Sequence, residues 1–472
     1  MTNDTSIKLI ENRTFDELRI GDSASLVRTL TLRDIELFAV MSGDVNPAHV
    51  DVEYAKSDMF HKVIAHGMWS GALISTVLGT QLPGPGTIYL GQSMRFHRPV
   101  GIGDTLTVTL RVTEMHPDTH RVQFECQVLN DRDECVVSGT ADVIAPTEKI
   151  SRPRIELPEV QLHDKDRRYR ALISMTSKLP PIRTAVVQPA DRVSLAGAIE
   201  AAKAGLIVPV LVGNEEKIRQ AAHEAGIDLS VYEVVPTPHS HAAAAEAVAM
   251  ARAGKVQALM KGALHTAELM HAVVDKEYGL RTERRISHVF AIDVPTYSRP
   301  LFITDAAINI YPSLEDKRDI VQNAIDLAHA LDIRLPKVAI LSALETVYPK
   351  IQSTVEAAAL CKMADRGQIT GGILDGPMAF DLAVSVKAAQ TKGMVSPVAG
   401  HADILVVPDL ESGNMLAKQL EYLADAQVAG IVLGARVPII LTSRADETLA
   451  RMASCALATL LVASMAAPKL AI

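Results

Sequence analysis

The sequence has few cysteines, and no spacing pairs them. Its four cysteines, Cys126, Cys135, Cys361 and Cys455, form no Cys-x-x-Cys pair and no ligand set interleaved with His, so neither a zinc site nor a disulfide framework is expected. A basic block is also missing, because 47 Lys and Arg residues stand against 55 Asp and Glu residues and give a net charge of −8. This balance argues against nucleic acid or an anionic membrane as the main partner. We expect a protein of the reducing cytoplasm.

We also find no pattern that predicts a targeting, membrane-spanning or nucleotide-binding segment. The first residues, MTNDTSIKLIENR, contain no apolar stretch typical of a secretory signal. The most apolar stretch, 452–467, has roughly 16 residues before Pro468, which is short for a membrane span, and it predicts a buried C-terminal helix. No glycine-rich stretch reads G-x-G-x-x-G or G-x-x-x-x-G-K-[ST]. Neither a dinucleotide fingerprint nor a P-loop is therefore supported.

The length of the chain indicates more than one domain, since 472 residues exceed the usual size of a single compact core. Composition changes over 146–164, where prolines and mixed charges occur without a sustained apolar period. We interpret this stretch as a linker between a domain at 1–145 and a domain at 165–472.

The two domains differ in their hydrophobic pattern. In the first, an apolar helical stretch at 66–80 precedes four segments of alternating hydrophobicity, at 87–96, 105–115, 120–130 and 134–145. This order predicts an α+β fold in which an antiparallel sheet wraps a helix. In the second, short apolar runs such as TAVVQP, VPVLVG and KVAILSA alternate with Ala-rich helical stretches. That alternation predicts an α/β fold with mostly parallel strands flanked by helices on both faces.

The octapeptide SGDVNPAH is the first candidate site. Asp44 and His49 lie five residues apart, and Asn46-Pro47 between them prevents a continuous helix, so a loop must direct both side chains. A carboxylate beside an imidazole can fix its tautomer and raise its basicity, which suits activation of a water molecule. The ordinary alternative is an Asp that caps a helix and a His on the surface. We take Asp44 and His49 as catalytic candidates and Asn46 as a substrate-binding candidate.

The start of the long helix, in AHGMWSGAL, is the second part of this site. Unpaired N–H groups and the helix dipole at His66-Gly67 can polarise a thioester carbonyl. Gly67 would let a substrate approach the backbone closely, although a glycine placed there for packing alone is the alternative.

Together SGDVNPAH, AHG before the helix and LPGPGTIYLGQSMRFHRPV resemble the MaoC-like (R)-specific enoyl-CoA hydratases, over about residues 10–145. The resemblance implies a hot-dog fold in which Asp44 and His49 bind and activate water and the Gly67 amide stabilises the enolate oxygen. Ala48 stands where that family usually has a branched aliphatic residue, which implies a slightly reshaped pocket. Because hot-dog domains typically pair, the resemblance also implies a homo-oligomer, at least a dimer.

The second domain contains basic groups that could bind an anion. In VPIILTSRADETLARMA a strand ends at Ser443-Arg444 before a helix, so Ser443 can cap the helix while Arg444 lies at its positive end. Arg281 and Arg285 occur in GLRTERRISHV just before a strand. An ordinary helix cap and a solvated basic face are the alternatives for these two segments.

An acidic strand end is the other candidate in this domain. In ITGGILDGPMAFDLAV we place Asp375 and Gly376 at the carboxyl end of a strand, where open α/β sheets bind ligands, and take both as substrate-binding candidates.

Ordered segments across nearly all of 165–472 resemble the phosphate acetyl/butyryltransferase family, among them LMKGALHTAELMHAVV, GLRTERRISHV, ITDAAINIYPSLEDK and VPIILTSRAD. The resemblance implies two subdomains with a cleft and reversible acyl transfer, in which the CoA thiolate attacks the acyl-phosphate carbonyl and phosphate leaves. Ser443 would then steer the thiol, and Arg444 would offset negative charge at the phosphate and the developing oxyanion. No metal is implied.

The sequence departs from the acetyl-specific members of that family at one point. They usually read SRG with an acidic residue, proposed as the base of the thiol, about six or seven positions later, whereas TSRADE has Asp446 and Glu447 closer and Ala450 at the later position. The base is therefore not assigned. The forms TSRAD and ITDAAINI are closer to the butyryl-type members, which points to acyl chains longer than acetyl.

Three functional hypotheses follow. The first is a bifunctional cytoplasmic enzyme that hydrates 2-enoyl-CoA and transfers acyl groups between CoA and phosphate. The second keeps only the transferase active and makes the hot-dog half an acyl-CoA-binding or dimerising module. The third is an NAD-dependent dehydrogenase of related architecture, against which the missing fingerprint argues. On the first hypothesis the ligands are acyl-CoA and phosphate or acyl phosphate, with no metal and no cofactor other than CoA as a substrate.

Overall fold

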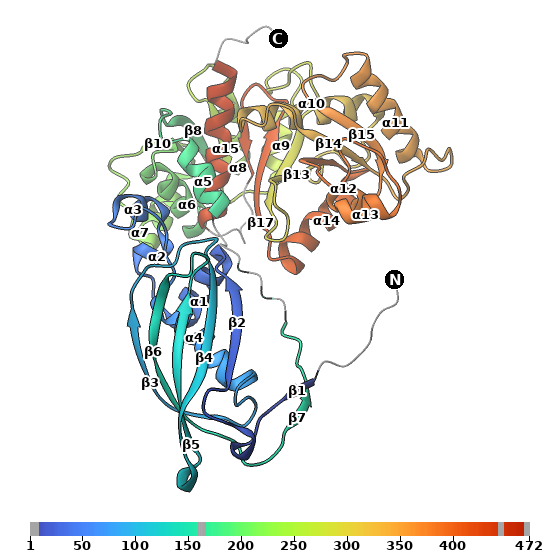
Figure 1. Cartoon of the computed structure of the whole chain (residues 1–472). Helices are drawn as coiled ribbons and strands as arrows, with labels where there is room; N and C mark the ends of the chain where they lie inside the picture. The colour runs from blue at the N-terminus through green and yellow to red at the C-terminus, as the bar shows by residue number, and fades with distance from the viewer. Residues whose placement is uncertain (1–8, 159, 161, 163–166, 442–447, 467–472) are drawn as a thin grey trace. The chain divides into compact units, whose positions relative to one another are not determined.

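The computed structural model describes residues 9–158, 160, 162, 167–441 and 448–466 (Figure 1). The chain divides into two compact units, unit 1 at Met1–His163 and unit 2 at Asp164–Ile472. The boundary lies within the stretch that the sequence indicates as a linker.

Unit 1 is a five-stranded antiparallel sheet with one long helix against it. The strands lie in the order β2 (Ser23–Thr29), β4 (Thr105–His116), β5 (Arg121–Leu129), β6 (Cys135–Ile144) and β3 (Ile88–Phe96). Helix α4 (Gly67–Thr80) contacts β2, β3 and β4 (Figure 1). Alternate residues of β4, from Leu106 to Val112, are buried against this helix side, as a one-faced sheet requires. The predicted helix, the four predicted strands and the α+β fold are confirmed.

Residues 146–163 of the predicted linker fall in unit 1 instead. Strand β7 (Ser151–Pro153) pairs antiparallel with β1 (Leu9–Glu11). The Asn12 side chain strengthens this pairing, because its amide donates to the Glu148 carbonyl at 2.8 Å and its oxygen accepts from the Ile150 N–H at 2.9 Å. The pairing joins the two ends of the unit, so the local composition of 146–164 could not reveal it.

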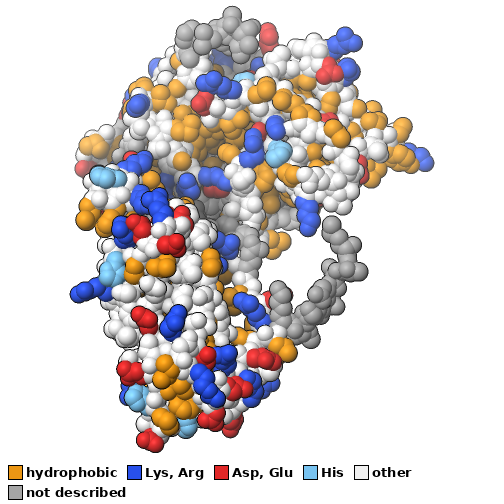
Figure 2. All heavy atoms as spheres, viewed as in Figure 1, with side chains coloured by type: hydrophobic (Ala, Val, Ile, Leu, Met, Phe, Trp, Pro, Cys, Tyr) orange, Lys and Arg blue, Asp and Glu red, His pale blue; other side chains and the backbone are white. Residues whose placement is uncertain are grey.

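The remaining elements of unit 1 are short except for one helix. They are the 3-10 turns η1 (Phe15–Glu17) and η2 (Pro117–Thr119) and the helices α1 (Leu32–Ser42), α2 (Pro47–Val50) and α3 (Val52–Ser57). On the face shown in Figure 2, acidic and basic side chains of unit 1 are interspersed rather than gathered by sign.

Unit 2 contains one sheet of eleven strands with two parallel wings. The first wing consists of β10 (Glu233–Pro236), β9 (Ile207–Gly213), β8 (Ile182–Val187), β11 (Ala258–Lys261) and β18 (Ile439–Ile440). The second consists of β13 (Leu301–Thr304), β16 (Ile404–Val406), β14 (Lys337–Leu341) and β15 (Ile373–Met378). Between the wings lie β17 (Gln427–Leu433) and β12 (Ser287–Asp293), which pair antiparallel with each other and with their outer neighbours. The mostly parallel sheet is confirmed, and its antiparallel centre is an addition.

Helices cover both faces of this sheet, as predicted (Figure 1). One face carries α5 (Arg167–Met175), α6 (Arg192–Lys203), α7 (Glu215–Ala225), α10 (Leu314–Ala330), α11 (Gln352–Asp365) and α15 (Thr448–Ala466). The other carries α8 (Ser240–Arg252) and α9 (Thr266–Val273) on the first wing, and α12 (Phe380–Val384), α13 (Val386–Thr391) and α14 (Leu410–Leu423) on the second. Successive side chains of a strand point to opposite faces of the sheet, so an apolar strand packs against both helix layers. In β8, Val186 packs in the first layer, and Ala185 and Val187 pack in the second.

Helix α15 is the one described helix that is long and apolar enough to cross a membrane, and 56% of its most apolar window is buried inside the protein. Its polar groups also bond to unit 2: Thr459 Oγ1 donates to the Leu206 carbonyl at 3.0 Å, and Arg451 Nη1 donates to the Val193 carbonyl at 2.8 Å. The predicted buried C-terminal helix is confirmed, and its described part extends to Thr448, four residues before the apolar stretch.

Candidate functional sites

The loop that carries Asp44 is shaped by its own side chains. Gly43 ends α1 with a φ of 74°, a left-handed conformation that glycine adopts without strain. Asp44 Oδ1 accepts from the Asn46 N–H at 3.2 Å, and Asn46 Oδ1 accepts from the Ala48 N–H at 3.1 Å and caps α2, in which Pro47 is the first residue. The Asn46 side chain thus has a local structural task, and its role in binding substrate stays a prediction.

His49 lies half-buried on α2, and its tautomer is set by the backbone. Its Nδ1 lies 2.9 Å from the Ile64 carbonyl oxygen. A carbonyl oxygen only accepts, so Nδ1 of the neutral ring carries the proton and Nε2 carries a lone pair. The sequence led us to expect that Asp44 would fix this tautomer, and the structure assigns that task to Ile64. The result for catalysis is the same, because His49 Nε2 is left able to take a proton.

The side chain of His66 belongs to the site, whereas the sequence pointed only to the backbone at His66-Gly67. This histidine precedes α4, is only 2% exposed, and stacks on His49 with ring centroids 4.0 Å apart. Its Nε2 lies 3.0 Å from the Asp44 carbonyl oxygen, which makes Nε2 the donor and ties the Asp44 loop to the helix start. Its Nδ1 is buried with no hydrogen-bond partner in the described part of the chain. The signal in the sequence was the polar residue directly before an apolar helix, in AHG.

A pocket of about 320 Å³ lies beside these residues and is lined by both histidines, Gly67 and Phe96. Gly67 is the first residue of α4, so its N–H has no acceptor within the helix and can donate to a ligand. A Cβ on Gly67 would lie 3.1 Å from Phe96 Cε1. The glycine therefore keeps both the amide and the adjoining pocket wall accessible. The arrangement combines a base, a helix-start donor and a cavity, which suits addition of water to an activated carbonyl compound.

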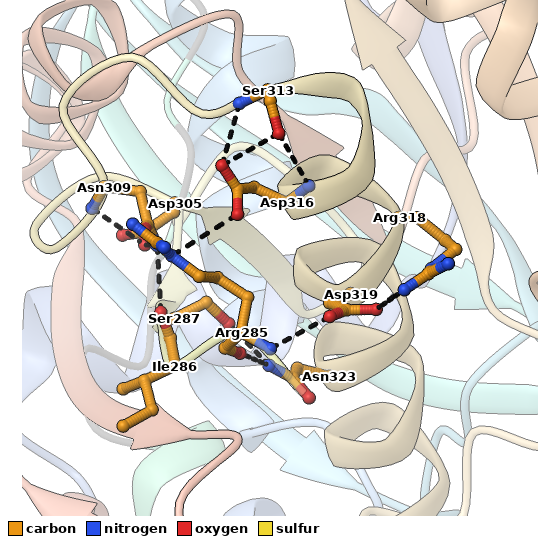
Figure 3. Close-up of polar contacts among 10 residues, drawn as sticks. All are labelled: Arg285, Ile286, Ser287, Asp305, Asn309, Ser313, Asp316, Arg318, Asp319 and Asn323. Atoms are coloured by element: carbon orange, nitrogen blue, oxygen red, sulfur yellow. Dashed lines mark hydrogen bonds and ion pairs between the residues drawn. The ribbon is translucent and has the colours of Figure 1, made fainter. Parts of the chain in front are cut away.

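In unit 2, Arg285 is held by polar side chains from two segments (Figure 3). Its Nε donates to Asn309 Oδ1 at 2.6 Å, and Asp316 Oδ1 of α10 lies 3.5 Å from the same nitrogen. Its backbone N–H donates to Asp319 Oδ2 at 2.9 Å. The two terminal nitrogens make no hydrogen bond to any described residue, and the side chain is 52% exposed. The guanidinium is oriented, with two donor groups left for an anion.

Asp305 is linked to this arginine through Asn309 and was not among the sequence candidates. It follows β13, is 3% exposed, and accepts from the N–H groups of Ala307 and Ile308 at 3.0 and 3.1 Å. The Asn309 amide donates to its Oδ2 at 2.5 Å (Figure 3). Burial raises the pKa of Asp305, and these donors oppose that rise. Asp305 thus holds Asn309 and, through it, Arg285. The available signal was an Asp directly after an apolar strand, in LFITD.

Of the other candidates in the basic segments of unit 2, Arg281 lies four residues before Arg285, and the remaining ones lie outside the described residues. Arg281 is exposed and its backbone bridges to Ala435, just after β17. Ser443 and Arg444 lie outside the described residues, as do Asp446 and Glu447.

Asp375 and Gly376 lie within the edge strand β15 (Ile373–Met378) rather than at its end, although the register with β14 shifts after Asp375 and pairing resumes at Met378. Strands β13, β16 and β14 separate β15 from β12 in the sheet. A Cβ on Gly376 would lie 2.7 Å from the Ile340 carbonyl oxygen, so the glycine allows close approach of β14. Asp375 Oδ1 accepts from the Gly376 N–H at 2.8 Å. Placement at a strand end was wrong, and a binding role for these two residues stays a prediction.

Comparison with known families matches both units. A family described as "Phosphate acetyl/butaryl transferase" matches residues 237–459, and one described as "MaoC like domain" matches residues 20–132. A phosphate acetyltransferase of Rhizobium meliloti is 62% identical over 304 residues, which cover 64% of this chain and 96% of that protein.

Two solved structures match one unit each. The branched-chain phosphotransacylase of Enterococcus faecalis V583 is 30% identical with a TM-score of 0.53, and the match covers 60% of this chain and 99% of that one. The R-hydratase PhaJ1 of Pseudomonas aeruginosa is 46% identical with a TM-score of 0.32, and the match covers 33% of this chain and 99% of that one.

Proposed function

The chain belongs to the phosphate acetyl/butyryltransferase family and carries a MaoC-like hot-dog domain, and we propose that it is a bifunctional acyl-CoA enzyme. Unit 2 transfers an acyl group between CoA and phosphate. Unit 1 hydrates a 2-enoyl-CoA to a 3-hydroxyacyl-CoA. The substrates are acyl-CoA with phosphate or acyl phosphate, no metal is required, and CoA enters as a substrate rather than a bound cofactor.

The transferase proposal rests on the 62% identity to a phosphate acetyltransferase over 96% of its length. In the forward direction a phosphate oxygen attacks the thioester carbonyl, the C–S bond breaks, and CoA leaves as a thiolate that takes a proton. Arg285, with its two free terminal NH₂ groups, would bind the phosphate. Ser443 would steer the sulfur and Arg444 would offset the developing charge, as the family resemblance implies.

Phosphate-dependent release of CoA from acetyl-CoA tests this activity directly. Arg285→Lys keeps the charge and removes the fork, so it should raise the KM for phosphate about tenfold or more. Arg219→Ala, which removes one partner of an exposed ion pair on α7, is the control and should leave the rate unchanged. Unchanged phosphate kinetics in Arg285→Lys would remove Arg285 from the site, and no CoA release at all would refute the transferase.

The acyl group is proposed to be short. The relative with 62% identity is named an acetyltransferase, whereas the branched-chain phosphotransacylase is 30% identical. The motif forms TSRAD and ITDAAINI point the other way, toward chains longer than acetyl. Comparing kcat/KM for acetyl-, butyryl- and isobutyryl-CoA decides between these two indications.

The hydratase proposal rests on one observation, the lone pair left on His49 Nε2 by the bond from Nδ1 to the Ile64 carbonyl. His49, assisted by Asp44, removes a proton from water, and the oxygen forms a bond to C3 of the enoyl group. The π electrons move to the thioester oxygen, where the Gly67 N–H stabilises the enolate. The enolate then takes at C2 the proton that His49 removed from water, so the base is restored and one water molecule is added in all.

The main alternative is that unit 1 only binds acyl-CoA or joins copies of the chain. Loss of the ultraviolet absorbance of crotonyl-CoA supports hydration, and its absence at high enzyme concentration supports the alternative. We also propose at least a dimer. Strand β3 is at the edge of its sheet and exposes Ile88, Tyr89, Leu90 and Phe96, which a second copy would cover. A monomer mass by light scattering would contradict this.

A further inference from the structure

Three side chains at the unit 1 site have the composition of a transition-metal site. Asp44, His49 and His66 each offer one ligand atom, and these atoms lie within 4.8 Å of one another. Two imidazoles and one carboxylate suit Zn²⁺ and neighbouring divalent transition metals, whereas Mg²⁺ and Ca²⁺ prefer oxygen ligands alone.

The second ring nitrogen of each histidine is already held in the way that metal-binding histidines require. His49 Nδ1 lies 2.9 Å from the Ile64 carbonyl oxygen, and His66 Nε2 lies 3.0 Å from the Asp44 carbonyl oxygen. Such backbone partners fix the tautomer and leave the opposite nitrogen with its lone pair, which is the usual outer contact of a ligating imidazole. The free lone pairs are those of His49 Nε2 and His66 Nδ1.

The lone pair on His66 is the observation that hydration of an enoyl group does not explain. Nδ1 is buried without a hydrogen-bond partner among the described residues, and the whole side chain is 2% exposed. An unsatisfied polar atom in such a place costs free energy unless something binds it. The ligand atoms that we assign on this ground are His66 Nδ1, His49 Nε2 and a carboxylate oxygen of Asp44, and the exposed Asp44 carboxylate gives the ion a way in.

We propose that Asp44, His49 and His66 bind one Zn²⁺ ion, and that this ion reversibly inhibits the hydratase site. The inhibition part rests on the proposed function of unit 1, because Zn²⁺ would occupy the Nε2 lone pair that His49 needs to take a proton from water. The transferase in unit 2 uses other residues, so the same ion leaves it active. Zinc would thus stop one activity of the chain and spare the other.

Metal binding is measured first, without any activity, on the full-length protein treated with EDTA and dialysed. Calorimetry with ZnCl₂ should give one site per chain, and CoCl₂ should give visible d–d absorption. His66→Gln and Asp44→Asn should each weaken binding about tenfold or more, with circular dichroism confirming the fold. His116→Gln, which removes an exposed His on β4, should bind as the wild type does. Binding of equal strength in wild type and His66→Gln, or no stoichiometric binding, overturns the proposal.

Activity then separates the two proposals. In the wild type, Zn²⁺ should abolish crotonyl-CoA hydration, EDTA should restore it, and phosphate-dependent CoA release should not change. His66→Gln should keep measurable hydration with at least a tenfold higher concentration of Zn²⁺ for half inhibition. If Zn²⁺ binds at these residues and the metal-free protein hydrates nothing, the site stands and the hydratase function fails. If hydration proceeds and Zn²⁺ leaves it unchanged, the inhibitory site is refuted and the hydratase stands.

Discussion

His49 and His66 show how a backbone carbonyl decides the chemistry of a single side chain. Each ring donates one N–H to a carbonyl, which leaves the other nitrogen with a lone pair. For His49 that lone pair makes a base, and for His66 it makes a buried unpartnered atom. Neither state can be read from the residue type, because it depends on which backbone atom lies beside the ring.

His288 in β12 is a third histidine, and its protonation bears on stability. It is fully buried, and burial lowers its pKa to about 3, far under its usual value. The folded state therefore holds His288 neutral. The stability that it contributes is present above about pH 6.5 and is lost as the pH falls from there toward 3, because the unfolded chain binds the proton first.

We expect the free energy of unfolding of unit 2 to fall by about 1.4 kcal/mol per pH unit below 6.5 on account of His288, or about 2 kcal/mol at pH 5. His288→Gln should remove this slope, whatever it does to stability at pH 7, and His223→Gln, an exposed His on α7, should not. Urea titrations followed by far-ultraviolet circular dichroism measure the slope. Trp69, the single tryptophan, reports unit 1 separately by fluorescence. An identical slope in wild type and His288→Gln would contradict this assignment.

The N-terminus of α4 supplies a free backbone N–H that can act as a donor in catalysis. Its first residue, Gly67, has an N–H with no acceptor in the helix, and His66 before it has φ −57° and ψ 132°, a conformation compatible with a following proline. Proline is favoured at the first helical position because that N–H is not needed there. The amide can thus be removed without breaking the helix.

Gly67→Pro should reduce crotonyl-CoA hydration by about 10² to 10³, the usual effect of losing one oxyanion donor. Gly67→Ala is the matched control, because it adds the same Cβ, 3.1 Å from Phe96, and keeps the N–H. Its hydration should stay within about tenfold of the wild type. The comparison is made as kcat on folded, purified variants. Equal losses in both variants would assign the effect to Phe96 and the pocket wall instead of to the amide.

The edge pair β14–β15 gives a prediction about packing. Gly376→Ala would place a Cβ 2.7 Å from the Ile340 carbonyl oxygen, which forces the two strands apart and should cost about 1 to 3 kcal/mol. Thermal unfolding of unit 2 measures this cost. Asp375→Asn keeps the number of heavy atoms and should leave the melting temperature nearly unchanged, so a change in its phosphate or CoA kinetics would support the binding role. A Gly376→Ala variant of normal stability would show that the strands accommodate the methyl group.

Elements with a local cause were predictable from the sequence. The alternation in 105–115 and the apolar run at 66–80 predicted β4 and α4, because burial on one face leaves a periodic trace. The antiparallel pairing of β17 with β18 in the large sheet could also have been predicted from the sequence. Only residues 434–438 separate β17 from β18, and a connection that short cannot return as a parallel crossover. The pairing of β1 with β7 was not, because its partners lie at opposite ends of unit 1.

The residues of the candidate sites also separate into those with a local cause in the sequence and those that depend on distant partners. SGDVNPAH indicated its loop because Asn-Pro and Asp have strong turn and cap preferences, and the structure uses Asn46 in that role. The side chains of His66 and Asp305 were missed because their importance comes from burial and from partners elsewhere in the unit. Asp375 was placed at a strand end, whereas β15 runs on to Met378 after a register shift that follows Asp375.

At the scale of the whole molecule, the chain joins two units that each have their own core and their own candidate chemistry. The catalytic candidates of unit 1 are all on α2, α4 and the loop before α2, and none of these elements is part of the sheet of unit 2. The candidates of unit 2 all occur after residue 280. Such a division predicts that one activity can be removed without the other.

His49→Ala or Asp44→Asn should abolish hydration of crotonyl-CoA and leave phosphate-dependent CoA release within about twofold of the wild type. Removing a positioned base costs about 10² to 10⁴ in rate. Arg444→Ala should do the reverse, since losing a charge-assisted bond to the phosphate costs about 1.5 to 3 kcal/mol, or roughly ten- to a hundredfold. Both activities are measured on each purified variant, with circular dichroism for folding.

Three outcomes distinguish the possible organisations. Hydration that survives in His49→Ala shows that another group is the base, and normal transfer in Arg444→Ala removes Arg444 from the transferase site. A folded His49→Ala protein that loses both activities shows that the two sites are coupled. In that case the His49 imidazole, which is bonded to the Ile64 carbonyl and packed on the His66 ring within unit 1, acts beyond that unit, and the interpretation as two separable catalytic units fails.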